Sequence, residues 1–193
     1  MNLVKIITAF VAACLITSCS ALYYGFLPGS DYKILKTEKE IDFQGRSFNI
    51  EFRDSRGKRN IIDCSEYVLD RETELEGSPG LQFFRDSLTA MVQGSNGKID
   101  PASPNKIVVE LEGLSFNLIG RGYVTVHGFV QFKVASSFMN KTYCSDMTDH
   151  DEDAPLKSNS WATRKTASRL MVSGSMRKAS ENFLQSLQIA QMI

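Results

Sequence analysis

The sequence predicts an α+β domain: an antiparallel sheet of about four strands, with two helices packed on one face. Three observations predict this class. Strand-like alternation occurs before and after a first helical pattern, two long strand patterns meet at a glycine-containing turn, and a long helical pattern closes the chain. Helices gathered on one face of an antiparallel sheet bury the apolar sides of both layers.

The first strand is expected at residues 48–52, where Phe48, Ile50 and Phe52 alternate with polar residues. This alternation is typical of a strand with one buried face. We also expect a short strand around Ile34-Leu35, and a second strand or an irregular covering segment within residues 60–69.

The first helix is expected from Ser78 to Gly94. Ser78 suits the helix cap, and Pro79 is tolerated at the first helical position. The apolar positions recur at helical spacing: Leu81, Phe84, Leu88 and Met91. Gly94 ends the pattern, so the helix has one apolar face available for a core.

A long hairpin with a turn at residues 120–122 is the next predicted element. In its first strand the apolar phase shifts by one residue after Gly113, and a shift at a glycine indicates a β-bulge. The return strand places one set of apolar side chains on a common face: Val124, Val126, Val130, Phe132 and Val134. A third strand is expected at residues 142–147, after a turn at Asn140-Lys141.

The last predicted element is a helix over roughly residues 162–189. Its apolar stripe consists of Val172, Met176, Ala179, Phe183 and Leu187. The run Ser173-Gly174-Ser175 interrupts helix propensity, and we expect it either to kink the helix or to permit close packing.

The N-terminus has the pattern of a secretory signal. Lys5 is the only charge before Asp31, and the apolar stretch at residues 3–16 is shorter than the ~20 residues of a spanning helix. The stretch ends in Ile16-Thr17-Ser18-Cys19, which resembles the lipobox of bacterial lipoproteins. The resemblance implies cleavage before Cys19 and acylation of its thiol. A box ending at Cys14 and an uncleaved anchor are the alternatives.

The chain is therefore expected to have three parts. They are a lipoprotein signal peptide at residues 1–18, a lipid anchor and tether at residues 19–44, and a single α+β envelope domain at residues 45–193. Aromatic residues within 22–28 either lie at the membrane interface or fold onto the domain. Ser20 follows the lipidated cysteine, and in the resembled class a residue other than aspartate there implies sorting to the outer membrane.

Charge and cysteine content narrow the function classes. Removal of residues 1–18 leaves 21 basic and 22 acidic residues, and this balance argues against nucleic-acid binding. After Cys14 is removed and Cys19 is acylated, Cys64 and Cys144 remain in a compartment that favours oxidation. They form either a disulfide, worth roughly 4–5 kcal/mol in the chain-entropy description, or two partly buried free thiols.

Candidate chemistry is sparse. His127 is either a ligand or catalytic group or a sheet-face histidine under another element, and we expect the second. His150 lies in the acidic run 149–153, with Asp146 nearby in the sequence. This acidic segment is either a calcium or transition-metal site or a solvated loop. EF-hand spacing, a nucleophile elbow, a phosphate loop and a paired Cys-x-x-Cys are all absent from the sequence. We therefore expect a solvated loop, no metal, no cofactor and no catalysis.

The order of elements resembles that of the YajG-type outer-membrane lipoproteins. This order is the lipobox, an early strand, the helix at 81–92, the hairpin at 106–134, a short strand after Asn140 and a long final helix. The resemblance covers about residues 45–190 as a pattern. Its matching stretches are residues 88–97 leading into Lys106-Ile107-Val108-Val109-Glu110, and Asn140-Lys141-Thr142-Tyr143. Relatives by architecture include auxiliary lipoproteins of lipid-transport ABC systems and the lipoprotein plug of the lipopolysaccharide translocon. The insert at residues 146–160 and the cysteine pair depart from the pattern.

The resemblance implies a non-enzymatic envelope role and supplies no catalytic residues. We therefore expect a lipid-anchored, periplasm-facing accessory or adaptor protein in envelope assembly or lipid transport. It would lie at the outer membrane, bound through its lipid and to an envelope protein partner. The alternatives are a ligand-binding module for lipid or cell-wall fragments, and an envelope enzyme.

Overall fold

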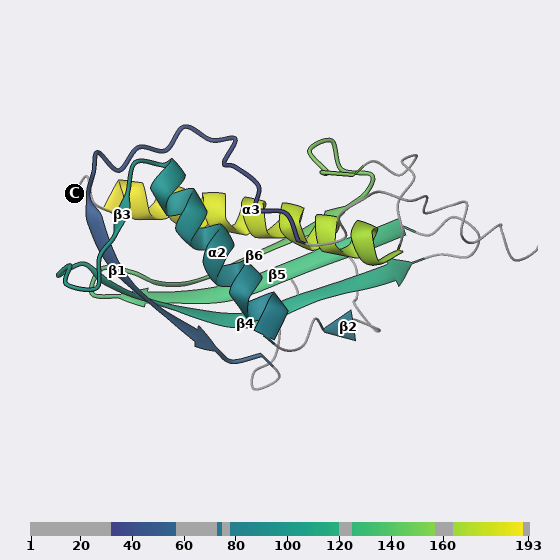
Figure 1. Ribbon diagram of the computed structural model, residues 1–193, viewed down its shortest axis with the longest axis horizontal. Helices are drawn as coiled ribbons and strands as arrows, with labels where there is room; N and C mark the ends of the chain where they lie inside the picture. The colour runs from purple at the N-terminus through teal and green to yellow at the C-terminus, as the bar shows by residue number, and fades with distance from the viewer. Residues whose placement is uncertain (1–31, 57–72, 75–77, 120–124, 157–163, 191–193) are drawn as a thin grey trace, which may run out of the picture.

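The structure, a computed structural model, describes residues 32–56, 73–74, 78–119, 125–156 and 164–190. Within these ranges one sheet carries two helices on the same face (Figure 1). The signal segment, the first part of the tether, the expected covering segment at 60–69 and the turn at 120–122 lie outside the described residues.

The main order of the sheet is β3-β1-β4-β5-β6, and a short further strand, β2, pairs with β4 outside that order. The strands are β1 (Ser47–Asp54), β2 (Thr73–Glu74), β3 (Lys98–Ile99), β4 (Lys106–Ile119), β5 (Thr125–Ser136) and β6 (Asn140–Thr148). The helices are α2 (Ser78–Gly94) and α3 (Arg164–Ala190).

The prediction of a four-stranded antiparallel sheet is wrong in strand number and in direction. β1 pairs in parallel with both β4 and β3, whereas β4, β5 and β6 are antiparallel as expected. The physical reason is that α2 lies between β1 and β4 in the chain. A helical crossover returns the chain to the end of the sheet where the first strand began, so that neighbouring strands can run in parallel. The short strand expected around Ile34-Leu35 is also absent, because residues 32–46 contain no strand.

The central hairpin matches its sequence pattern closely. The register between β4 and β5 shifts between Leu111 and Gly113, which confirms the predicted β-bulge. The bulge keeps both apolar phases of β4 on the core side, because Ile107, Val109, Leu111 and Leu114 are all fully buried.

Phe132 on β5 joins the two layers. Its ring lies 5.4 Å from that of Phe84 on α2, 6.1 Å from that of Phe183 on α3 and 5.8 Å from that of Tyr143 on β6. Both helices therefore pack on the same face of the sheet. The predicted stripe of α3 (Val172, Met176, Ala179, Phe183, Leu187) is buried along its whole length.

The run Ser173-Gly174-Ser175 permits close packing, and α3 continues through it as one helix. The Oγ of Ser175 donates a hydrogen bond to the backbone oxygen of Gly128 on β5, at 2.8 Å. A Cβ atom at Gly128 would lie 2.4 Å from the carbonyl carbon of Met171, so helix and strand touch backbone to backbone there. Glycine is required on the strand because any side chain would push the helix away.

A second layer covers the polar side of α3. Residues 33–40, which we call the strap, lie along the helix without forming a helix or strand of their own. The backbone N–H of Lys33 donates to Ser173 Oγ at 3.1 Å, and that of Glu38 donates to Glu181 Oε1 at 2.6 Å. Three residues of α3 that bond to the strap are buried: Ser173, Arg177 and Glu181.

Candidate functional site

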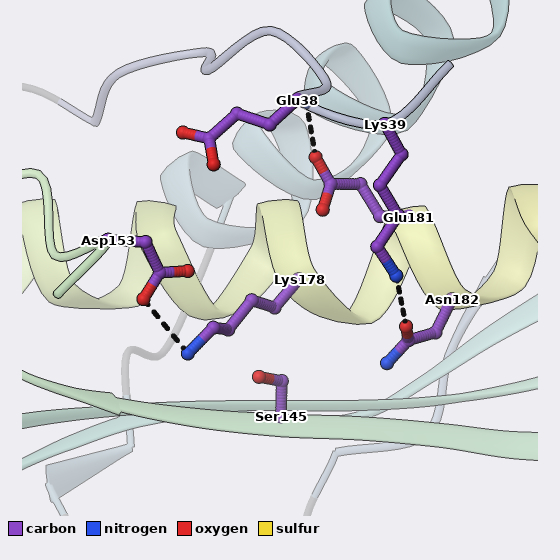
Figure 2. Close-up of a pocket in the computed structure, with 7 residues that line it drawn as sticks. All are labelled: Glu38, Lys39, Ser145, Asp153, Lys178, Glu181 and Asn182. Carbon is purple, nitrogen blue, oxygen red and sulfur yellow. Dashed lines mark hydrogen bonds and ion pairs between the residues drawn. The ribbon is translucent and has the colours of Figure 1, made fainter. Parts of the chain in front are cut away.

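A groove of about 300 Å³ lies between the strap, α3 and β6 (Figure 2). Every residue that lines it is polar or charged: Glu38, Lys39, Ser145, Asp153, Lys178, Glu181 and Asn182. The strap supplies the first two, β6 the serine, the loop after β6 the aspartate, and α3 the last three. The groove therefore suits a polar or charged ligand rather than an acyl chain.

The part of α3 that faces the groove follows directly from helical spacing. Lys178, Glu181 and Asn182 are three and four residues apart, so they share one side of the helix, away from its apolar stripe. The hydrogen bond from the Glu38 N–H orients the Glu181 carboxylate, which is only 4% exposed. The strap thus both covers and positions a groove carboxylate.

Behind the groove, Arg177 connects the strap with the loop after β6. Its guanidinium group pairs with the Glu38 carboxylate and donates to Asp153 twice, to Oδ2 at 3.0 Å and to the backbone oxygen at 2.9 Å. Lys178 Nζ lies 3.1 Å from the other carboxylate oxygen of Asp153. The Arg177 side of this network is buried, because Arg177 is only 6% exposed.

Lys39 differs from Lys178 in its partners. Its ammonium group donates to Asn182 Oδ1 at 2.9 Å and to Gln185 Oε1 at 3.0 Å, both of them neutral amide oxygens. In the part of the chain that the structure describes, no carboxylate forms an ion pair with Lys39. Its charge is therefore available to an anionic group of a ligand.

The charges around Asp153 change its acidity. Partial burial raises the pKa of this carboxyl group, but the hydrogen bond and charge of Lys178, with the charge of Arg177, lower it more. The net result is a pKa below the ordinary value of 3.8. Asp153 is thus ionised in the folded protein throughout the neutral and mildly acidic range.

This shift predicts the pH dependence of an Asp153→Asn variant. A lowered folded-state pKa contributes stability that is fully present above the unfolded-state value and is lost as the pH falls through the folded-state value. At pH 7 the variant should be less stable than wild type by up to about 1 kcal/mol, since the Asp153 side chain is 31% exposed and solvent screens its ion pairs. Urea unfolding should show this difference shrinking below about pH 4. A difference that stays constant from pH 7 to pH 2.5, or a similar profile for Glu40→Gln, would contradict the assignment.

Neither histidine lines the groove. His127 is fully buried, and its Nε2 lies 3.1 Å from Asp146 Oδ2. Because alternate residues of a strand face opposite sides and Gly128 faces α3, His127 points away from the helices. His150 is exposed, with its Nε2 3.2 Å from Thr125 Oγ1. Ser145, the hydroxyl in the groove, donates to the Asp146 backbone oxygen at 3.2 Å, so hydrogen bonding and charge are the chemistry that the groove offers.

The carboxylates of the acidic run bind groups of the chain itself. Asp149 Oδ1 accepts the Val126 N–H at 3.3 Å, and Asp151 Oδ2 accepts the Thr148 N–H at 2.7 Å. Among the described residues, no three or more His, Cys, Asp or Glu side chains are grouped as metal ligands. These carboxylates fasten the end of β6 to its neighbours, and only Asp153 of the run reaches the groove.

The cysteines remain largely untested. Cys19 and Cys64 lie outside the described residues. Cys144 lies on β6, where it pairs in register with Gln131. Its expected partner, Cys64, lies outside the described residues, so the disulfide between them stays a prediction.

Sequence reasoning identified one groove residue, Asp153, as part of the acidic run. The available signal for α3 was the polar set at spacing three and four on the side of the helix away from the apolar stripe. No local pattern in the sequence indicates that Glu38 and Lys39 meet α3, because that contact spans more than 140 residues.

The fold and the groove define a class: a mixed α+β domain with a two-helix layer on a partly parallel sheet and a polar groove beside the last helix. None of the helices in the described ranges combines the length and hydropathy that crossing a membrane requires. No protein-family model matches the sequence, and comparison with curated proteins finds no significant match.

Three solved structures were found to be similar to this chain. A crystal structure of a Xanthomonas campestris protein assigned to the DUF330 family matches with a TM-score of 0.51 at 11% identity, over 84% of this chain and 95% of that one. An uncharacterized protein matches at 9% identity and a TM-score of 0.42, over 80% and 99% of the two chains. A minor lipoprotein from Acinetobacter baumannii matches at 6% identity and a TM-score of 0.41, over 78% of this chain and 95% of that one. The first likeness shows a shared fold, and the specific resemblance to YajG-type lipoproteins is not confirmed.

Proposed function

We propose that this protein is a lipid-anchored accessory or adaptor protein of the bacterial envelope, with its domain facing the periplasm at the outer membrane. The observation that carries the proposal is the sequence Ile16-Thr17-Ser18-Cys19 at the end of a short apolar stretch. The role in this proposal is non-catalytic, and the groove lining offers ion-pairing, amide and hydroxyl groups for binding.

The start of the described chain supports an anchored arrangement. Tyr32 stacks on Phe83 of α2 with ring centroids 4.4 Å apart, and its ring also lies 5.2 Å from the Arg169 guanidinium group on α3. Residues 19–31 would connect this point to the lipid, and a chain of that length spans at most about 45 Å. The domain would thus stay close to the membrane surface.

The anchor is tested by labelling cells with an alkyne analogue of palmitate. Wild-type protein should carry the label and sediment with membranes, because acylated Cys19 holds it there. A Cys19→Ser variant should lose the label completely and keep residues 1–18, which mass spectrometry of the intact chain would show.

Cys14→Ser is the matched control, because it removes the cysteine of the alternative box. This variant should label and sediment like wild type. Label that persists in Cys19→Ser, or that is lost in Cys14→Ser, would overturn the assignment of Cys19.

The groove favours a second candidate function, a binding module for a polar cell-wall fragment. Its lining carries both ammonium and carboxylate groups and no apolar side chain. Peptide fragments of the cell wall carry the same two kinds of charge. Native mass spectrometry with a purified cell-wall tripeptide would test this candidate, and no complex at millimolar peptide would argue against it.

The adaptor role predicts that one groove charge matters for partner binding. Lys39→Glu should reduce the recovery of co-purifying envelope proteins from detergent-solubilised membranes by about tenfold, because like charges would replace an attractive contact. Lys36→Glu makes the same charge change at an exposed strap position that does not line the groove. Equal recovery with both variants, or a wild-type protein recovered as a monomer alone, would contradict an adaptor function at this groove.

A further inference from the structure

The surface of α3 beneath the strap is polar, although it is buried. Ser173, Arg177 and Glu181, which all bond to the strap, are each at most 6% exposed. The opposite side of the same helix packs on the sheet through an apolar stripe. A helix face that stays permanently covered gains most from apolar residues, whereas a polar face loses little when water reaches it.

The contacts that the strap makes with α3 are also mostly polar. Between Lys33 and Glu40 the strap is held by two backbone hydrogen bonds to side chains of α3, by the pairing of Glu38 with Arg177, and by the two amide contacts of Lys39. Ile34 is 49% exposed. Segments with few buried apolar contacts open at a lower free energy than the core.

The residues on either side of the strap are held by aromatic and apolar contacts, unlike the strap itself. On one side, Tyr32 stacks on Phe83. On the other, Ile41 and Phe43 are buried in the main core, and the Phe43 N–H donates to the Ser95 backbone oxygen at 2.8 Å. The strap can therefore separate from α3 while the rest of the domain stays folded.

We propose that the strap is a detachable wall of the groove, latched by the contact between Glu38 and Arg177. Figure 2 shows the strap residues Glu38 and Lys39 on one side of the groove, with Glu181 and Asn182 of α3 beside them. Detachment removes Glu38 and Lys39 from the lining and exposes the carboxylate of Glu181. The groove then becomes a longer trough along α3, open to an extended polar segment of a ligand or partner.

Detachment also lengthens the tether, a consequence that rests on the proposed lipid anchor. Residues 33–40 add about 25–30 Å to the reach of the chain when they are extended and free, provided that the Tyr32 stack also opens. The domain could then contact a partner farther from the membrane than the closed form allows.

Hydrogen exchange on the full mature protein in detergent tests the proposal. The amides of Lys33 and Glu38, which bond to α3, should exchange at least about 100-fold faster than core amides of β4 and β5. Raising the salt concentration from 0.05 to 0.5 M should increase the exchange rates of the strap amides and leave those of the core amides unchanged, because salt screens the ion pair between Glu38 and Arg177.

Two glutamate variants isolate the latch. Glu38→Gln removes the charge that pairs with Arg177, and should speed exchange of the strap amides several-fold without changing core exchange. Glu40→Gln makes the same substitution two residues away at an exposed position, and should leave strap exchange at the wild-type rate.

Strap amides that exchange as slowly as the core would overturn the proposal, as would equal effects of the two variants. The exchange experiment does not depend on acylation, so a failure of the Cys19 assignment leaves its result unaffected. Conversely, slow exchange of the strap amides would not contradict the proposed acylation of Cys19.

Discussion

Replacing Gly128 with alanine is expected to lower the free energy of unfolding by about 1–3 kcal/mol. A Cβ atom there would lie 2.4 Å from both the carbonyl carbon of Met171 and the backbone nitrogen of Val172. These are backbone atoms of α3, which cannot rotate away as a side chain can. The helix must instead move off the sheet, and the hydrogen bond from Ser175 to the Gly128 oxygen would be strained as well.

Two other glycines provide matched controls. A Cβ atom at Gly174 would meet side chains, Met147 Sδ at 2.0 Å and Pro155 Cδ at 3.0 Å, and alanine is about 1 kcal/mol better than glycine inside a helix. At Gly94 a Cβ atom would meet nothing within 4 Å. Urea unfolding should therefore rank the losses as Gly128→Ala largest, Gly174→Ala intermediate and Gly94→Ala within about 0.5 kcal/mol of wild type. A Gly128→Ala protein as stable as Gly94→Ala would show that helix and strand are not in backbone contact.

Elements with strong local patterns could be predicted from the sequence. Both helices, the hairpin and its bulge at Gly113 follow from periodicity over eight or more residues. The strand expected at residues 142–147 is also present, but β6 begins at Asn140, where a turn was expected. The apolar stripe of α3 was also identified correctly, because a helix that packs on a sheet must repeat apolar residues at this spacing.

Features that depend on distant contacts could not be predicted in this way. β3 is two residues long, too short for any alternation to show. The parallel pairing of β1 with β4 depends on a crossover between them, although the position of α2 in the element order was a usable hint. The groove requires the strap to meet α3, and its charged residues resemble any solvated segment when read locally.

The other large expected effect is at Phe132. Phe132→Ala should lower the free energy of unfolding by about 3–5 kcal/mol, because a fully buried ring is replaced by a cavity. The ring is the common neighbour of Phe84, Tyr143 and Phe183, so its loss loosens α2, β6 and α3 from β5 at once. Phe138→Ala is the control: it removes the same side chain at a position 41% exposed, and should cost less than about 0.5 kcal/mol.

Double variants should then show which parts of the core act as one unit. Phe132→Ala combined with Phe183→Ala should cost less than the sum of the single changes, because both side chains border the same cavity. Leu170 belongs to a separate buried cluster with Val126 and Met147 at the other end of α3. Phe132→Ala with Leu170→Ala should therefore be additive within about 0.5 kcal/mol. Strong coupling between Phe132 and Leu170 would contradict the two-cluster core and imply that α3 transmits packing changes along its length.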